Sequence, residues 1–288
     1  MTSQKIIPAR NWGQRVAAAF LIAVVILLIF MVGTSRHITW SAIPQYIFDE
    51  TILDGIRLTI LFTVLSMVIS IVAGAILATM RLSPNPVLSG FASLYIWFFR
   101  GTPLLVQIIF WFNIQLFIPS IDIGSFHLDT NVIVTAFVAA LLALSLNEAA
   151  YMAEIIRGGL LAVDSGQHEA AKALGYTPTQ SMLRIIFPQA LRVIIPPIGN
   201  QTISMLKTTS LVSVVAAQDL LTRAQNIYAR NFLIIELLIV ASIWYLAMTT
   251  IASAIQYLIE QHLGKSTRQA PGLWRNALRL MRAEGRNG

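Results

Sequence analysis

The chain has 288 residues, of which 56% are hydrophobic and 11% charged, whereas about a quarter of the residues in an average soluble domain are charged. This composition excludes a soluble globular protein and indicates a polytopic membrane protein. The lack of cysteine excludes disulfides and thiolate metal sites. The net charge of +7 is no sign of nucleic-acid binding, because residues 1–15 and 263–288 together carry +8 and the segment between them −1.

The first apolar segment, residues 16–33, follows a basic leader with Lys5, Arg10 and Arg15. A cleaved signal peptide has the same basic start and apolar centre. We favour a retained transmembrane helix that starts in the cytoplasm, because the run is longer than a usual signal core and is followed by a poor cleavage site. Residues 34–57 are then expected to form a polar link on the outer side.

Residues 87–119 are too long for one straight crossing, since about 20 residues suffice. A helix break is predicted within them at Arg100, Gly101, Thr102 and Pro103, because Thr102 can cap a helix and Pro103 can open one. We expect an interfacial or tilted helix before the break and a spanning helix from Pro103 to about residue 118.

The other predicted spans are residues 58–80, 131–160, 185 to about 205, and 232–259, with Pro196-Pro197 expected to kink the fifth. The expected fold is therefore all-α, a polytopic bundle of six transmembrane helices with both termini cytoplasmic. Basic termini fit the excess of Lys and Arg on the cytoplasmic side. Lys207, Arg223 and Arg230 are exceptions, because this topology places them outside.

A polar segment with clear helix signals, residues 164–188, lies between the fourth and fifth spans, on the cytoplasmic side of this topology. Asp164 can cap a helix, with Gln167 completing a variant of the capping box. Gly175 suits the left-handed residue just past a helix end. A second helix start follows, formed by Thr177, Pro178 and Gln180. Two short helices joined by a glycine indicate a docking surface for another protein.

Polar side chains inside spans are costly and indicate function by default. On the fourth span, Glu148 must face a cavity or another helix, whereas Glu154 can pair with Arg157. The candidate substrate pathway comprises Asn147, Glu148, Tyr151 and Glu154 on this span and Asn200, Ser204 and Lys207 on the fifth. Both stripes suit a zwitterionic solute, and both equally fit interhelical hydrogen bonds.

No enzymatic constellation is present in the sequence. The single Gly-Lys-Ser, at residues 264–266, lacks the glycine that a phosphate-binding loop needs at the position of Ile259. The four histidines do not have metal-ligand spacing. We therefore expect no catalytic residue, metal or cofactor on this chain. The tail, residues 263–288, fits either an amphipathic helix on an anionic membrane surface or a disordered basic segment.

The run Glu169-Ala170-Ala171, with Gly175 and Pro188 at the expected distances, resembles the "EAA" loop of binding-protein-dependent ABC importer permeases. Phe187 stands where that pattern usually has Leu. Further segments resemble the polar amino-acid branch of that family (histidine, glutamine, glutamate, arginine and opine permeases): residues 100–107, 147–159, 187–190 and 207–211. The likeness divides the chain into residues 1–50, a permease core 51–262 with a coupling loop 161–188, and the tail 263–288.

The resemblance implies a permease subunit of the bacterial inner membrane that imports a polar amino acid or related small zwitterion. The implied partners are a second permease subunit (the same or a sister chain), an extracytoplasmic solute-binding protein, and cytoplasmic ATPase subunits that bind ATP and Mg. Members of this branch often have only five spans, so residues 16–33 would be an added helix. The ATPase-coupling residues would be Glu169, Ala170, Ala171, Gly175 and Pro188.

Two other functions compete with this one. A secondary transporter or channel working alone predicts inverted repeats, and no convincing repeat is found. A non-transporting membrane scaffold would have no use for Glu148 inside a span.

Overall fold

Long helices dominate the computed structural model, which describes residues 12–35, 38–123 and 126–264. In chain order the elements are α1 (Trp12–Gly33), α2 (Ala42–Ile47), α3 (Glu50–Leu82), α4 (Pro86–Gly101), α5 (Leu104–Phe112), the 3₁₀ turn η1 (Ile114–Leu116), β1 (Ser120–Ile123), β2 (Phe126–Asp129), α6 (Thr130–Ile133), α7 (Ala136–Leu161), α8 (Ser165–Ala173), α9 (Pro178–Ser181), the π-helical turn η2 (Met182–Ile186), α10 (Phe187–Thr208), the 3₁₀ turn η3 (Thr209–Val215), α11 (Leu220–Asn231) and α12 (Ile234–Gly264). The predicted leader and the interpretations of the tail fall mainly on residues 1–11 and 265–288, outside the described residues.

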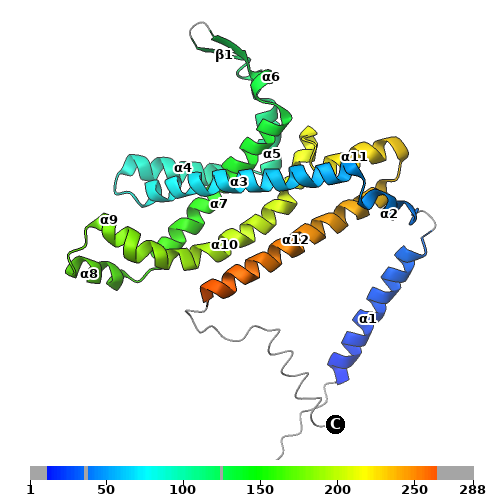
Figure 1. Ribbon diagram of the computed structural model, residues 1–288, viewed down its shortest axis with the longest axis horizontal. Coiled ribbons are helices and arrows are strands. Elements are labelled where there is room, and N and C mark those ends of the chain that lie inside the picture. Colours follow the sequence, from blue (N-terminus) through cyan, green and yellow to red (C-terminus); the bar gives the residue numbers. More distant parts are fainter. Residues whose placement is uncertain (1–11, 36–37, 124–125, 265–288) are drawn as a thin grey trace, which may run out of the picture.

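Four helical segments of the described chain are long and apolar enough to cross a membrane: α3, α7, the segment Pro178–Val215 that contains α10, and α12. The helices α4 and α5 pass the same test together but are bent by 100°. The bend confirms the predicted break, which lies at Thr102 and Pro103 between the two helices. The helix α1 forms over the predicted first span, with mostly exposed side chains, and lies apart from the bundle in Figure 1.

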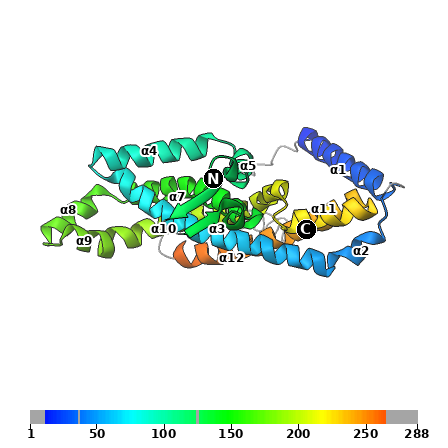
Figure 2. The same ribbon diagram turned by 90° about the horizontal axis from the view of Figure 1, so that it is seen from above.

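The two ends of the bundle differ in the elements they carry. The short helices α8 and α9 lie at one end, and α2 and α11 lie at the opposite end (Figures 1 and 2). Between them α3 and α7 pack closely, and a Cβ added at Gly74 would lie 2.4 Å from the Met152 Cβ. Ser70 Oγ donates to the Ser145 carbonyl oxygen at 2.9 Å. Small residues allow this approach, as is common where membrane helices pack.

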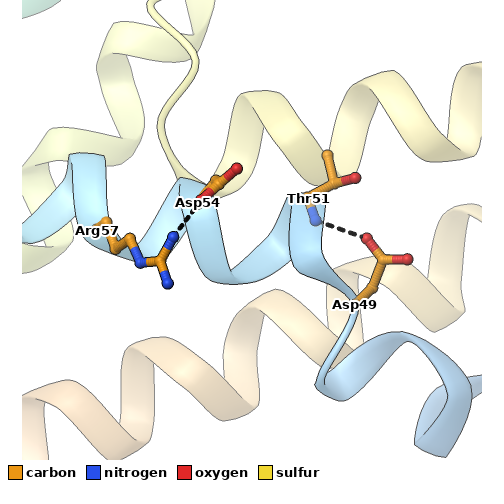
Figure 3. A network of polar contacts seen from close by, with 4 residues as sticks. All are labelled: Asp49, Thr51, Asp54 and Arg57. Atoms are coloured by element: carbon orange, nitrogen blue, oxygen red, sulfur yellow. Dashed lines mark hydrogen bonds and ion pairs between the residues drawn. The ribbon is translucent and has the colours of Figure 1, made fainter.

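The predicted polar link over residues 34–57 is wrong from residue 50 on. The helix α3 already begins at Glu50, where the Asp49 carboxylate accepts a hydrogen bond from the Thr51 amide at 2.9 Å, and Arg57 pairs with Asp54 at 2.7 Å (Figure 3). A helix of 33 residues is about 50 Å long, so it exceeds the roughly 30 Å hydrocarbon core of a bilayer. Asp49 and Glu50 thus cap and begin a helix that is longer than the hydrocarbon core is thick.

The all-α prediction also needs a correction between the third and fourth predicted spans. Residues 120–129 include an antiparallel pair of strands, β1 and β2, in which Ser120 lies opposite Asp129. The hairpin projects away from the helices in Figure 1. Alternating apolar residues on both sides of a central Gly-Ser pair form a hairpin pattern.

The fifth predicted span continues without interruption through both of its prolines, since α10 runs from Phe187 to Thr208. Gln256 Nε2 on α12 donates to the Pro196 carbonyl oxygen at 3.2 Å. The proline pair therefore does not end the helix, and a bend at the pair stays a prediction.

A buried polar cluster joins α3, α11 and α12 at the end opposite α8. Asp219 is fully buried and caps α11, accepting from the Leu221 and Thr222 amides and the Thr222 hydroxyl. Tyr245 donates to the same carboxylate at 3.3 Å, and Thr59 Oγ1 accepts from the Leu220 amide at 3.1 Å. Burial raises the pKa of the Asp219 carboxyl above its ordinary value, although the bonds from Thr222 oppose this.

Candidate functional sites

The loop between α7 and α10 begins with a capped helix, as its sequence predicts. The Asp164 carboxylate accepts from the Gly166 amide at 2.8 Å and so caps α8. The predicted capping box with Gln167 is not formed. Instead, Gln167 Oε1 accepts from Gln189 Nε2 at 3.2 Å, and that nitrogen also lies 2.9 Å from the Ile185 carbonyl oxygen. Gln167 therefore ties α8 to the first turn of α10.

Gly175 ends α8 in the left-handed conformation, with φ of +76°. The Tyr176 amide donates to the Ala171 carbonyl at 3.1 Å, and the Gly175 amide donates to the Lys172 carbonyl at 3.0 Å. These two bonds form a Schellman motif. A Cβ at this position would meet nothing within 4 Å, so the backbone conformation alone requires glycine.

The second helix start forms the full capping box that its sequence predicts. Thr177 Oγ1 accepts from the Gln180 amide at 3.3 Å, Gln180 Oε1 accepts from the Thr177 amide at 3.0 Å, and Pro178 occupies the first turn. The chain then passes through η2, in which the Phe187 amide reaches back to the Met182 carbonyl, five residues earlier. This wide turn precedes Pro188, which cannot donate a backbone hydrogen bond. The segment from α9 through η2 to α10 is thus one continuous helical unit, and α8 packs against its start.

The predicted coupling residues divide into exposed and buried positions. Glu169 and Ala170 are exposed, and Leu174 is 76% exposed beside Gly175. Ala171 is completely buried, because α8 packs against α9 and η2. Ala171 therefore holds α8 in place and is not part of an exposed docking surface.

Asn147 fixes the helix break rather than facing an open path. Its Nδ2 donates to the Phe99 carbonyl oxygen at 2.7 Å. Gln107 Nε2 donates to the same oxygen at 3.1 Å and to Thr102 Oγ1 at 2.7 Å. Carbonyls at the end of a helix lack partners within it, and these two amides supply them at the end of α4. Gln107 was missed in the sequence because its partner lies in another helix.

Glu148 is 8% exposed and faces the neighbouring helix α10. Gln201 Nε2 donates to Glu148 Oε1 at 3.0 Å. The two residues are 53 positions apart and join the fourth and fifth predicted spans.

A partly exposed polar cluster lies further along α7. Arg157 Nη2 bonds Glu154 Oε2 at 2.7 Å, as the spacing predicts. The Arg100 guanidinium lies over the Tyr151 ring, 5.1 Å from its centroid. From its sequence position, Arg100 was expected to take part only in the helix break. Its position adds a cation beside Tyr151, and the Glu154 carboxylate lies one turn further along α7.

The polar stripe on α10 is exposed. Asn200, Ser204 and Lys207 all have exposed side chains. Among the described residues, a hydrogen bond from this region to α7 is made by the neighbouring Gln201. The two predicted stripes are therefore joined beside Asn200, not through it. No group of three or more His, Asp or Glu suited to a metal ion is found in the described part of the chain.

The sequence of this chain is similar to those of known proteins. Residues 70–265 match the family described as "Binding-protein-dependent transport system inner membrane component". The chain belongs to this family. It is 44% identical to the "Arginine transport system permease protein ArgU" of Corynebacterium glutamicum over 262 residues, covering 90% of this chain and 83% of that protein. It is 37% identical to the "L-cystine transport system permease protein TcyB" of Bacillus subtilis, covering 79% and 92%.

Solved structures agree with this family. An "amino acid ABC transporter with histidines" is 36% identical, with a TM-score of 0.65, and the match covers 74% of this chain and 94% of that one. A chain of the MetNI methionine ABC transporter shares the fold at 18% identity and a TM-score of 0.55, covering 75% and 97%. This protein is thus a membrane permease subunit of an amino-acid ABC importer.

Proposed function

We propose that this permease has six spans with both termini in the cytoplasm, and that the α8–α9 loop couples it to a separate ATPase that binds ATP and Mg. An extracytoplasmic solute-binding protein delivers a polar amino acid or related zwitterion. The relatives named above transport arginine and cystine by their names, and another, from Bacillus subtilis, is named as a probable glutamine permease. This range supports a polar amino acid as the solute class.

The observation that carries the coupling role is the construction of the loop. It is polar and mostly exposed, it is capped at both helix starts, and it continues directly into α10. An exposed leucine at position 174 gives it an apolar contact for a soluble partner. Movement of the loop would therefore be transmitted to α10 as movement of one body.

The exposed stripe on α10 supports a second permease chain. Polar side chains facing lipid are costly, yet Asn200, Ser204 and Lys207 are exposed on the single chain. A second permease chain, identical or a sister chain, would cover this stripe and remove that cost. The stripe would then lie beside an aqueous path between the two chains. The cluster of Arg100, Tyr151 and Glu154 offers a cation for a carboxylate and an anion for an ammonium group.

Reconstitution in proteoliposomes tests this function. The chain is combined with its ATPase and binding protein, and uptake of radiolabelled arginine, glutamine and cystine is measured with ATP inside. We expect uptake of at least one of them that requires ATP, the ATPase and the binding protein. Uptake by the chain alone would support a secondary transporter, and ATPase binding without uptake of any of the three would support a scaffold.

A further inference from the structure

Two arginines that break the charge pattern of the sequence, Arg223 and Arg230, line one cavity. It has a volume of about 450 Å³ and lies between α11 and the segment formed by α2 and the start of α3. The proposed topology places this end of the bundle outside the cytoplasm. The remaining lining residues are polar or amphipathic apart from one isoleucine: Tyr46, Thr51, Asn226, Ile227 and Asn231.

Helical spacing places the two arginines on the same face of α11, about two turns apart. Positions 223, 227 and 230 are separated by four and three residues, so they lie on one face of α11. The side chain of Arg223 crosses Gly55 on α3, where an added Cβ would lie 3.0 Å from the Arg223 Cγ. The stem of this arginine is thus held against α3, at the wall of the cavity.

The cations in this cavity are not neutralised within the described chain. Arg223 Nε is buried and has no hydrogen-bond partner there, and no ion pair is found for Arg230 in residues 12–35, 38–123 and 126–264. Of the nearby acids, Asp54 pairs with Arg57 and Asp49 caps α3 (Figure 3), and Glu50 has an exposed side chain that does not line the cavity. Both arginine side chains line the cavity without an acidic partner in the described chain, so an anionic group from outside the chain would stabilise them.

We propose that this cavity receives a carboxylate side chain from the surface of the extracytoplasmic binding protein and so anchors that protein on the permease. The inference rests on the proposed function, which supplies both the partner and the side of the membrane. Arginine binds carboxylates in a planar, bidentate manner. Two of them in one cavity suit one or two acidic side chains. The amides of Asn226 and Asn231 beside them already donate to Gln218 Oε1 and the Tyr46 hydroxyl, which leaves one N–H on each amide.

Two other sources of an anion fit less well. A free amino acid also carries an ammonium group, and no lining residue of the cavity has a carboxylate to accept it. A lipid phosphate is an alternative for any basic site, but the anionic surface potential belongs mainly to the cytoplasmic leaflet. A protein carboxylate needs only the cations and amides that are present.

The test uses the full transporter in nanodiscs of zwitterionic lipid, with Arg223→Gln and Arg230→Gln variants. Binding of the solute-loaded binding protein is measured by surface plasmon resonance at low and at high salt. We expect each variant to weaken binding about tenfold at low salt, because a charge-assisted contact is lost, and to lose much of the salt dependence. The matched control is Arg57→Gln, since Arg57 already has an acidic partner. The affinity of the binding protein for this variant is expected to change less than about twofold.

Further measurements check that the variants fold and identify the source of the anion. ATP hydrolysis without binding protein checks that the variants fold and assemble, and it is expected to stay at the level of the unmodified transporter. Lysine scanning of the binding protein's surface carboxylates is expected to find a position whose loss of affinity is not additive with Arg223→Gln. Unchanged affinity in both arginine variants overturns the inference while leaving uptake, and so the proposed function, intact. A defect confined to binding of free amino acid, or one that follows anionic lipid content, also overturns it.

Discussion

The two ends of this permease are built in contrasting ways. At the α8–α9 end the hydrogen bonds are short-range caps, such as those of Asp164 and Thr177, and the side-chain bond found between α8 and α10 joins Gln167 and Gln189. At the α2–α11 end the bonds join distant segments, with Leu220 donating to Thr59 across 161 residues. The first end is held by local bonds and by its continuation into α10, and the second is bonded to distant segments of the bundle.

This difference fits a division of labour within the importer. A coupling element must keep its own shape while its position changes, so local caps serve it better than ties to many helices. In the proposed function the opposite end presents a fixed surface to the binding protein, and buried long-range bonds keep that surface in place. The following predictions address this contrast, beginning with the largest effect.

Replacing the buried cap should destabilise the protein much more than replacing the exposed one. Asp219→Ala leaves the α11 amides and the Tyr245 hydroxyl without their acceptor, and we expect it to lower the free energy of unfolding by about 2–4 kcal/mol. Asp164→Ala removes an exposed cap of the same type and should cost about 1 kcal/mol or less. Thermal unfolding of the purified variants compares the two, and equal shifts would contradict the contrast.

Gly175→Val should uncouple the ATPase from transport without preventing membrane insertion. A β-branched residue at this left-handed φ costs about 1–2 kcal/mol or more. The loop is therefore expected to change shape and solute-stimulated ATP hydrolysis to fall severalfold. Gly175→Asn is the matched control, because asparagine adopts this conformation more readily. Normal stimulated hydrolysis in the valine variant would refute the coupling role.

Glu169→Lys should weaken docking of the ATPase by about fivefold, roughly 1 kcal/mol, because it reverses an exposed charge on the loop. Glu169→Gln should have a smaller effect in the same direction. Pull-down of the ATPase at graded salt measures both. An unchanged ATPase affinity in the lysine variant would remove Glu169 from the interface.

The smallest effect concerns the helix break. Asn147→Ala and Gln107→Ala each leave the Phe99 carbonyl with one donor, so each should cost about 0.5–1 kcal/mol. The double variant leaves it with none and should be more destabilised than the sum by about 0.5 kcal/mol or more. Thermal unfolding of all three variants gives this coupling, and strict additivity would show that the two amides act independently.

Local structure was largely predictable from the sequence. The signals at Thr177, Pro178 and Gly175 concern neighbours within a few residues, and each forms the cap or turn that its chemistry favours. The helix break at Thr102 and Pro103 is of the same kind. The start of α3 was missed because Asp49 and Glu50 were interpreted as part of a polar link. An acidic cap before apolar residues also begins a helix.

The partners of polar side chains were not predictable, because tertiary packing selects them. Gln167 has an intact capping-box spacing yet bonds Gln189 instead. Asn147 and Glu148 are adjacent in the sequence but reach α4 and α10 respectively, since consecutive helical residues point about 100° apart. The sequence could identify these residues as costly in a membrane, but not which neighbour would satisfy them.

The π-helical turn η2 bears on how the α8–α9 loop is oriented around the axis of α10. Its five-residue reach accommodates one residue more than an α-helical turn does. Removing one residue between positions 182 and 186 would restore the ordinary winding and leave the direction of the preceding segment nearly unchanged. Removing one residue from the α-helical part of α10 would instead rotate everything before it by about 100° around the axis of α10. The π-helical turn therefore accommodates one extra residue while Glu169 and Leu174 keep their direction relative to α10.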